Sequence, residues 1–506
     1  MSTTVEISPG PDLGSLKKQP ATAVIGYGLG DFAMNLAFSM GTSFLLYYLT
    51  DVAGVTAAAV GTMFLVVRLW DAFTDLFAGR LVDRTMTKFG KFRPFILWFA
   101  VPVLFLSVLN FNVPTPGVKW LGMFDVSLSA SGRVLYMYLA YAVLGLCYSL
   151  INIPYGSLAS AMSQSVSQRA KLVAGRAFGA AIGGVLLTYI VAPRISALQK
   201  TAPKLAANAD ATAKAAYDAA ALAYRQNVQS VFTTTTLLFV LIGSVAFLLT
   251  FFWCRETVVR TTPNVSIRET FDTLKHNKPL AFLCAASFFY LIGLFAVSGS
   301  TAYYAKYVMG DISQTATMTL MNSGIALLIT PFIPAIIRRF GKKTVFQWCG
   351  MFTVVGGVSL FFTPVGGLAL ALIFLAVKGI GASLINTVMF GLEADTVEYG
   401  EWKSGKRSEG ATYAIFSFTR KVTQSIGGAL GAWMLAFGGY LSATSTNPNP
   451  AQPDSAIWAI RFTIGLLPAM CAIIAMVIFW KYPLTDKIFA QIRNENEAAK
   501  AAAVAE

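Results

Sequence analysis

Charged residues are scarce in this chain: they make up 12% of its 506 residues, about half of what a soluble domain usually carries. Histidine occurs once, at His276, so a proton relay would have to use carboxylates. The five cysteines have no paired spacing, which argues against a disulfide framework or a metal site. There is no Walker A sequence and no G-x-S-x-G motif. These absences exclude a transporter driven directly by ATP within this chain, and we expect no enzymatic activity, no metal and no cofactor.

Hydrophobic residues, by contrast, make up 56% of the chain, and the mean hydropathy is +0.62. Long apolar runs recur over the whole length, and each can supply the roughly 20 residues that one bilayer crossing needs. We therefore expect an all-α integral membrane protein with twelve transmembrane helices, at about 22–49, 57–78, 94–113, 134–160, 173–193, 230–254, 279–305, 315–336, 345–363, 366–390, 411–440 and 457–481.

Lysine and arginine are concentrated in alternate loops, after the second, fourth, sixth and eighth spans. The opposite short loops are poorer in positive charge, so the positive-inside rule places both termini in the cytoplasm. Met1–Pro20 is polar and lacks a cleavable signal pattern. The net charge of +15 therefore reflects topology, and we do not expect nucleic acid as a partner.

Two halves of the chain carry the same local signal. GRLVDRTMTKFGKFRP (Gly79–Pro94) follows the second span, and IIRRFGKKTVF (Ile336–Phe346) follows the eighth. This echo predicts two duplicated six-helix bundles, an architecture of secondary transporters that bind their substrate near the midplane. The Ala-rich segment 200–227 is expected to be a helical periplasmic spacer, with a lid over the entrance as the alternative. We expect a cytoplasmic tail at 1–21, bundles at 22–254 and 279–481, a central cytoplasmic loop at 255–278 and a second tail at 482–506.

Charged residues interrupt the apolar second span at Arg68, Asp71 and Asp75. Their spacings of three and four place all three side chains on one face of a helix. Asp31 lies in the same way inside the first span. A charge at bilayer depth costs about 2.5 to 3.5 kcal/mol or more, so it survives where it lines a cavity, forms a pair or moves ions. Such carboxylates could bind Na⁺ or hold a proton; the alternative is an ion-pair network that only fixes helix packing.

Basic residues also lie at membrane depth: Arg176 opens the fifth span, Lys378 lies in the tenth, and Arg420 and Lys421 lie in the eleventh. Spare positive charge in a cavity favours an anionic substrate. In the alternative, Arg176 and Arg420 extend to the interface or pair with loop acids. We expect Arg420 and Lys421 on different faces of their helix, and the sequence suggests no partner for Lys378.

Four sets of strings are spread over nearly the whole chain: GDFAMN and YYLTDVAG in the first span, RLWDAFTDLFAGRLVDRT and GKFRPF within Arg68–Phe95, NIPYGSLASAMS at Asn152–Ser163, and GLEADTVEYGEWKSGKRSEG at Gly391–Gly410. They resemble the glycoside–pentoside–hexuronide:cation symporter family, a branch of the major facilitator superfamily. The last of these strings is long enough to be highly specific. Within the family, glucuronide carriers have the strings most similar to three segments of this chain, LGLCYSLINIPYGSLASAMSQ, SFTRK and YPLTDK. The resemblance implies the major facilitator fold and cation-coupled transport of a glycoside.

The resemblance also implies roles for single residues, by comparison with melibiose carriers of the family. Asp31 matches an acid that contacts the sugar there. Asn152 stands where those carriers have a fourth acid, which favours H⁺ over Na⁺ because a Na⁺ cage needs several oxygens. Gly156 stands where they have a tryptophan that stacks on the sugar, so melibiose itself is not expected. We expect cation coupling at Asp71, Asp75 and Lys421, and substrate binding at Asp31, Asn152, Tyr155, Arg176 and Lys421.

The third and fourth of these motifs lie at the expected cytoplasmic ends of spans 4 and 10. There we predict charge pairs between helices that close the cytoplasmic side. The alternative is a set of static surface pairs worth about 0 to 1 kcal/mol each. The predicted gating residues are Arg169, Glu393, Asp395 and Glu398.

Together these features predict a monomeric symporter of the bacterial inner membrane that imports a glucuronide or related sugar conjugate with H⁺ by alternating access. Na⁺ is the alternative cation, and a neutral glycoside or pentoside is the alternative substrate. Two further hypotheses stay open: a lysolipid carrier of the same fold, which would need a lateral hydrophobic cleft, and a membrane sugar sensor, which normally carries an extra soluble output domain.

Overall fold

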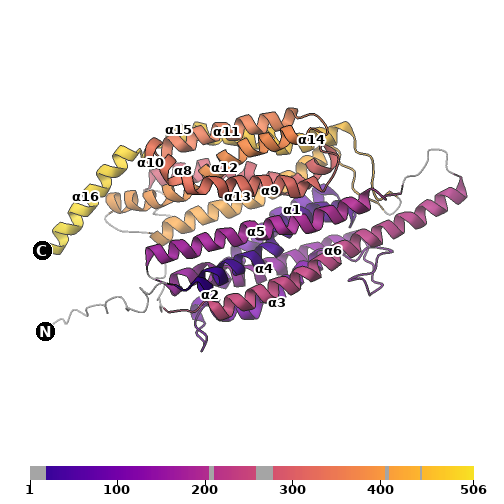
Figure 1. The fold of residues 1–506 in the computed structure, drawn as a ribbon, viewed down its shortest axis with the longest axis horizontal. Coiled ribbons are helices and arrows are strands. Elements are labelled where there is room, and N and C mark those ends of the chain that lie inside the picture. Colours follow the sequence, from indigo (N-terminus) through magenta and orange to yellow (C-terminus); the bar gives the residue numbers. More distant parts are fainter. Residues whose placement is uncertain are drawn as a thin grey trace.

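The computed structural model describes residues 19–163, 165–203, 210–257, 277–404, 409–444 and 447–505. Long helices dominate the described part of the chain (Figure 1). They are α1 (Ala21–Asp51), α2 (Ala57–Arg84), α3 (Arg93–Asn110), α4 (Ala130–Met162), α5 (Val166–Gln199), α6 (Ala211–Trp253), α8 (Lys278–Tyr307), α9 (Gln314–Ile329), η2 (Thr330–Phe332), α10 (Ile333–Phe340), α11 (Lys342–Phe362), α12 (Leu368–Ser404), α13 (Glu409–Phe437), α14 (Asp454–Ile464), α15 (Leu466–Trp480) and α16 (Asp486–Ala505).

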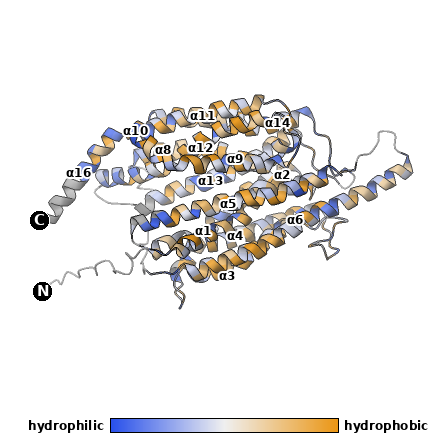
Figure 2. Cartoon of the chain, viewed as in Figure 1, coloured by the Kyte–Doolittle hydropathy of each residue, from blue (hydrophilic) through white to orange (hydrophobic). Residues whose placement is uncertain are grey.

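Eleven helical segments in the described residues are long and apolar enough to cross a membrane. They correspond to eleven of the twelve expected spans. The remaining expected span, 411–440, corresponds to α13, which carries polar side chains such as Arg420, Lys421 and Gln424 in its middle. Figure 2 shows apolar residues along the bundle and hydrophilic residues collected toward its two ends. The chain is therefore an all-helical, multi-pass membrane protein, as the sequence predicts.

The helices form two bundles, α1 to α6 and α8 to α15, which lie one below the other in Figure 1. Across their interface α2 packs against α13, α1 against α8, and α5 against α9. Small residues let helix backbones approach closely. In the first bundle, Gly179 of α5 packs against the backbone carbonyl of Gly28 on α1, too closely to leave room for a Cβ. We call the end where α1 begins and α15 ends the terminal end (left in Figure 1) and the opposite end the distal end.

The echo between the two halves has a common structural basis at the terminal end. Gly90 and Gly341 both have a positive φ, 106° and 78°, and each precedes the third helix of its bundle. Glu256, just after α6, accepts hydrogen bonds from three successive backbone N–H groups at the start of α3, at 2.8–2.9 Å. Asp486, the first residue of α16, lies against Gly341 and accepts one hydrogen bond, at 3.5 Å, from the Lys342 N–H at the start of α11. A carboxylate at the N-terminus of a helix is stabilising, so each bundle ties its sixth helix to its third.

Two of the expected spans are interrupted helices. The expected span 315–336 is built from α9, η2 and α10, and the change of helix type coincides with Pro331 and Pro334, which lack a backbone donor. The last span breaks between α14 and α15 at Gly465, whose carbonyl lies 2.6 Å from where a Cβ of Gly357 would be. The carbonyl of Ile464 has no helical donor four residues on, because Pro468 lacks an N–H, and the Lys378 ammonium donates to this carbonyl at 2.9 Å. This is the partner of Lys378 that sequence alone did not suggest.

The Ala-rich segment 200–227 lies largely within α6, and its residues 204–209 are outside the described part. Asp210 caps the helix by accepting a hydrogen bond from the Ala213 N–H at 2.7 Å. From there α6 runs without a break for 43 residues and projects beyond the bundle at the distal end (Figure 1). The segment is thus an extension of a spanning helix.

Candidate transport site

A cavity of about 320 Å³ lies between the bundles, from the middle of the molecule toward the terminal end. The charged face of α2 forms part of its wall, as the spacing of its three charged residues predicts. Helices α1, α4 and α5 supply the rest of the N-terminal wall, and α12 and α13 supply the opposite wall. The lining residues are Phe38, Arg68, Asp71, Asp75, Tyr148, Ser149, Asn152, Arg176, Phe390, Tyr413, Phe416, Ser417, Arg420, Lys421 and Gln424.

Asp75 joins the two walls of this cavity. Its carboxylate accepts a hydrogen bond from the Ser149 hydroxyl of α4 at 2.5 Å. It also forms an ion pair with the Lys421 ammonium of α13, in the opposite bundle. Two of the residues that we expected to couple the cation, Asp75 and Lys421, are therefore in direct contact in this structure.

Asp71, one turn earlier on α2, is poorly satisfied. Its nearest cation is the Arg68 guanidinium, at 3.8 Å from Oδ2. Its Oδ1 is buried and has no hydrogen-bond partner among the described residues. This oxygen packs against Gly145 of α4, too closely to leave room for a Cβ at that position. Such a carboxylate is costly as a lone buried charge and can accept a proton or a cation.

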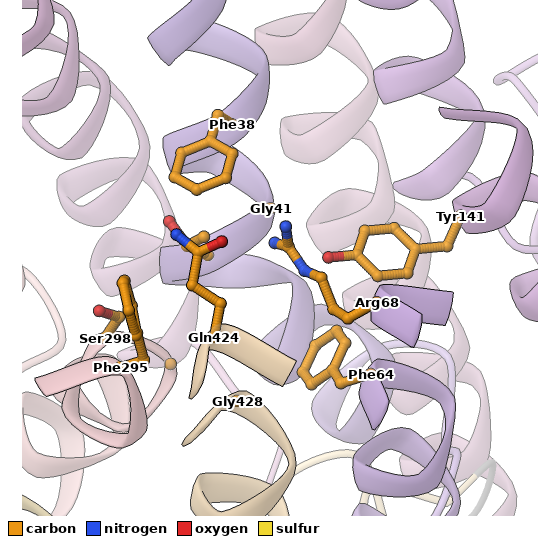
Figure 3. Close-up of a pocket in the computed structure, with 11 residues that line it drawn as sticks. Phe38, Gly41, Phe64, Arg68, Tyr141, Phe295, Ser298, Gln424 and Gly428 are labelled. Atoms are coloured by element: carbon orange, nitrogen blue, oxygen red, sulfur yellow. The ribbon is translucent and has the colours of Figure 1, made fainter. Parts of the chain in front are cut away.

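A smaller pocket, of about 100 Å³, adjoins the main cavity on its distal side. Figure 3 shows Arg68 from α2 and Gln424 from α13 pointing into this space from opposite bundles. The Arg68 guanidinium lies 5.5 Å from the ring centre of Phe38 and 5.8 Å from that of Tyr141. Arg68 is thus held by aromatic rings as well as by Asp71.

Asp31 and Arg176 form an ion pair between α1 and α5, with 3.1 Å between Oδ1 and Nε. Arg176 faces the cavity, and its guanidinium lies 5.2 Å from the ring centre of Tyr155. Tyr155, which we expected at the substrate site, does not line the cavity in this structure, because its side chain is fully buried. Its hydroxyl donates to the backbone carbonyl of Tyr27, and the two rings stack at 4.7 Å. Tyr155 supports Arg176 from behind.

Arg420 corrects a second expectation. It lines the same cavity as its neighbour Lys421, although consecutive helical residues point in different directions. Its guanidinium donates to the Asn386 amide oxygen at 3.2 Å and lies 4.9 Å from the ring centre of Phe390, both on α12. The cavity is wide enough for two adjacent positions of α13 to reach it.

The predicted gating residues lie at the terminal end: Arg169 in the first turn of α5, and Glu393, Asp395 and Glu398 on α12. Asp395 pairs with Lys342 of α11, at 2.6 and 2.7 Å. Both partners belong to the second bundle, so this is a charge pair between two helices of one bundle and not a contact between the bundles. It fixes α11 to α12 instead.

At the distal end the two bundles are joined by a residue that sequence analysis did not single out. Asp51, the last residue of α1, pairs with Lys306 of α8 at 2.9 Å, and the two side chains are only 5% and 10% exposed. The Tyr440 hydroxyl donates to the same carboxylate at 2.9 Å. A second, exposed pair between the bundles joins Lys200 to Asp311 at 3.4 Å. The distal end is therefore closed by interlocking charged and aromatic side chains.

Comparison with known proteins identifies the family to which this chain belongs. Residues 26–486 match the family described as MFS/sugar transport protein. The chain belongs to this family. It is 41% identical to a glucuronide carrier protein homolog of Escherichia coli, over 94% of this chain and 95% of the relative. It is 32% identical to a Salmonella typhimurium protein whose name describes a sulfoquinovose importer, over 93% and 91% of the two chains.

Among solved structures, the chain is similar to a bacterial homolog of the human lysosomal transporter Spinster in an inward-facing, unoccupied conformation. The TM-score is 0.63 at 11% identity, over 93% of this chain and 97% of that chain. At this identity the likeness concerns the fold, which is the major facilitator fold. The family resemblance predicted from the sequence is confirmed. The chain is a membrane transporter of sugar-like compounds.

Proposed function

We propose that this transporter imports an anionic glycoside, with a glucuronide as the leading candidate, together with protons across the bacterial inner membrane. The observation that carries the proposal is the charge balance around the cavity. Basic side chains outnumber carboxylates there, and positive potential in a binding site favours an anionic ligand. The basic residues are Arg68, Arg176, Arg420 and Lys421, and the acids are Asp31, Asp71 and Asp75.

The names of two relatives support the same substrate class. One describes a glucuronide carrier and the other a sulfoquinovose importer. A glucuronide carries a carboxylate and sulfoquinovose carries a sulfonate, so both are sugar derivatives with one permanent negative charge at neutral pH. A surplus of one cation in the cavity matches a substrate of this kind.

Asp71 and Asp75 are the proposed sites of the coupling proton. The unpartnered Oδ1 of Asp71 supports this role, because protonation would remove a buried charge that the surrounding residues satisfy poorly. Lys421 already neutralises Asp75, and the neighbouring Asn152 adds no further carboxylate. This favours H⁺ over Na⁺, which binds best among several oxygen ligands.

Alternating access would follow from the asymmetry between the two ends. The bundles interlock at the distal end, whereas the cavity extends toward the terminal end. The excess of lysine and arginine in the loops of the terminal end favours a cytoplasmic location for it. The structure would then represent an inward-facing state from which the substrate leaves into the cytoplasm.

Uptake of radiolabelled p-nitrophenyl-β-D-glucuronide into proteoliposomes tests this function. We expect accumulation with an imposed pH gradient and none with a Na⁺ gradient alone. Asp71→Asn and Asp75→Asn should abolish accumulation, while Asp125→Asn, which removes an exposed loop acid, should leave it unchanged. Uptake driven only by Na⁺ would contradict the proposed cation. No uptake under either gradient would contradict the substrate class.

A further inference from the structure

One basic side chain of the cavity has no acidic partner. Arg176 pairs with Asp31, Lys421 with Asp75, and Arg68 lies within 4 Å of Asp71. In the described part of the chain, no carboxylate lies within ion-pair distance of Arg420. The surplus positive charge of the cavity therefore resides at one residue of α13.

The surroundings of Arg420 hold its side chain in place without neutralising it. Asn386 and Phe390 are one turn apart on α12, so they face α13 together. The Asn386 amide oxygen accepts one hydrogen bond from Nη1, and the Phe390 ring lies beside the guanidinium. A guanidinium has five N–H donors, and this is its one hydrogen bond to the described residues. Most of its donors therefore remain free for a ligand in the cavity.

We propose that Arg420 binds the acidic group of the substrate and is the residue that selects acidic over neutral glycosides; this inference rests on the proposed function. The planar guanidinium can donate two parallel hydrogen bonds to a carboxylate, or to two oxygens of a sulfonate. The other cations of the cavity are less suitable, because each already lies beside an aspartate whose negative charge offsets its attraction for an anion.

The position of Arg420 also orients the ligand. Arg420 lies on the wall formed by the second bundle, whereas the polar groups of Tyr148, Ser149 and Asn152 lie on α4, in the first bundle. The volume of about 320 Å³ is at the lower end of the range for pockets that enclose a small organic ligand. A glycoside with its acidic group on Arg420 therefore places its hydroxyl groups against the first bundle and contacts both walls at once.

Binding measurements on the purified full-length protein test this assignment. The probes are p-nitrophenyl-β-D-glucuronide and the neutral p-nitrophenyl-β-D-glucoside, and the Kd of each is measured by calorimetry. Arg420→Gln should raise the Kd of the glucuronide by about 10- to 100-fold, the loss expected for charge-assisted hydrogen bonds, and leave the Kd of the glucoside unchanged. Arg420→Lys, which keeps the charge and loses the planar fork, should lie in between. Lys119→Gln, an exposed loop substitution with the same change in charge, is the matched control.

The preference for the acid over the neutral glycoside is the decisive readout, because a purely structural role would weaken both ligands equally. An unchanged glucuronide Kd in a folded Arg420→Gln protein would overturn the assignment and leave the proposed function standing. Equal losses for both ligands would also overturn it. A wild-type protein that binds the glucuronide no better than the glucoside would contradict anion selectivity, and one that neither binds nor accumulates the glucuronide would overturn the proposed function as well.

Discussion

The buried ion pair at the distal end provides the sharpest test of how this transporter changes conformation. Lys306→Met removes the ammonium and retains much of the volume of the side chain. It leaves the Asp51 carboxylate, 5% exposed, with hydrogen bonds from the hydroxyl groups of Thr50 and Tyr440 as its remaining side-chain partners among the described residues. The substitution should therefore destabilise the state in which the distal end is closed.

The size of the effect follows from burial. Removing one partner of a buried pair typically costs about 3 to 5 kcal/mol, because the remaining charge stays desolvated. When the distal end opens, water reaches Asp51 and the cost disappears. The full amount then acts on the equilibrium between closed and open forms, and about 3 kcal/mol corresponds to more than a hundredfold shift.

Cysteine accessibility measures this shift. Ser298 of the second bundle lines the smaller pocket beside the main cavity (Figure 3). A Ser298→Cys protein without its five native cysteines therefore offers a single thiol. In right-side-out vesicles a membrane-impermeant thiol reagent reaches this position only through the distal end. We expect Lys306→Met to increase the labelling rate at least tenfold.

The exposed pair between Lys200 and Asp311 supplies the matched control, because it crosses the same interface. Its lysine side chain is 72% exposed, and an exposed pair contributes about 0 to 1 kcal/mol. Lys200→Met should therefore change the labelling rate by less than about fivefold. Equal rates in wild type and Lys306→Met, or an equal increase in both variants, would refute the argument that the buried pair closes the distal end.

Two further predictions concern the walls of the cavity. Gly145→Ala places a methyl group against the Oδ1 of Asp71, so uptake driven by a pH gradient should fall at least tenfold. The circular dichroism spectrum of the variant should remain helical. Unchanged uptake would mean that the position of Asp71 is unimportant. Tyr155→Phe removes the hydrogen bond to the Tyr27 carbonyl and should lower the free energy of unfolding by about 1 kcal/mol, detected as a lower Tm. The same variant should leave the Kd of the glucuronide within about twofold, and a large loss of affinity would restore Tyr155 to the substrate site.

The elements that depend on local sequence could be predicted well. Apolar runs of sufficient length can only be spanning helices or buried cores, and the structure has helices at all twelve expected positions. The charged face of α2 could be predicted equally well, because a helix fixes the relative directions of Arg68, Asp71 and Asp75 whatever surrounds it. Their position on a cavity follows from the high cost of leaving charge in lipid.

Features that depend on how the bundles dock could not be predicted. Asp51 stands at the end of a span, where an acid is unremarkable, and its partner Lys306 lies 255 positions later in the chain. Tyr155 is one of many aromatic residues, and only the packing of α1 against α4 and α5 turns its ring away from the cavity. Arg420 and Lys421 reach one cavity because α13 borders a space between bundles rather than a single neighbouring helix.

The distribution of charge between the two walls suggests why a proton and an anion are suitable partners in this transporter. The first bundle contributes three aspartates and two arginines to the site, a formal charge of −1, and the second contributes Arg420 and Lys421, a charge of +2. In the proposed cycle a proton makes the first wall neutral, and a substrate anion lowers the second wall to +1. Each ligand thus reduces the magnitude of the charge on the wall that it binds, and the proton and the anion together carry no net charge. The fully loaded cavity has the same formal charge as the empty one, so both can reorient across the bilayer at a similar electrostatic cost.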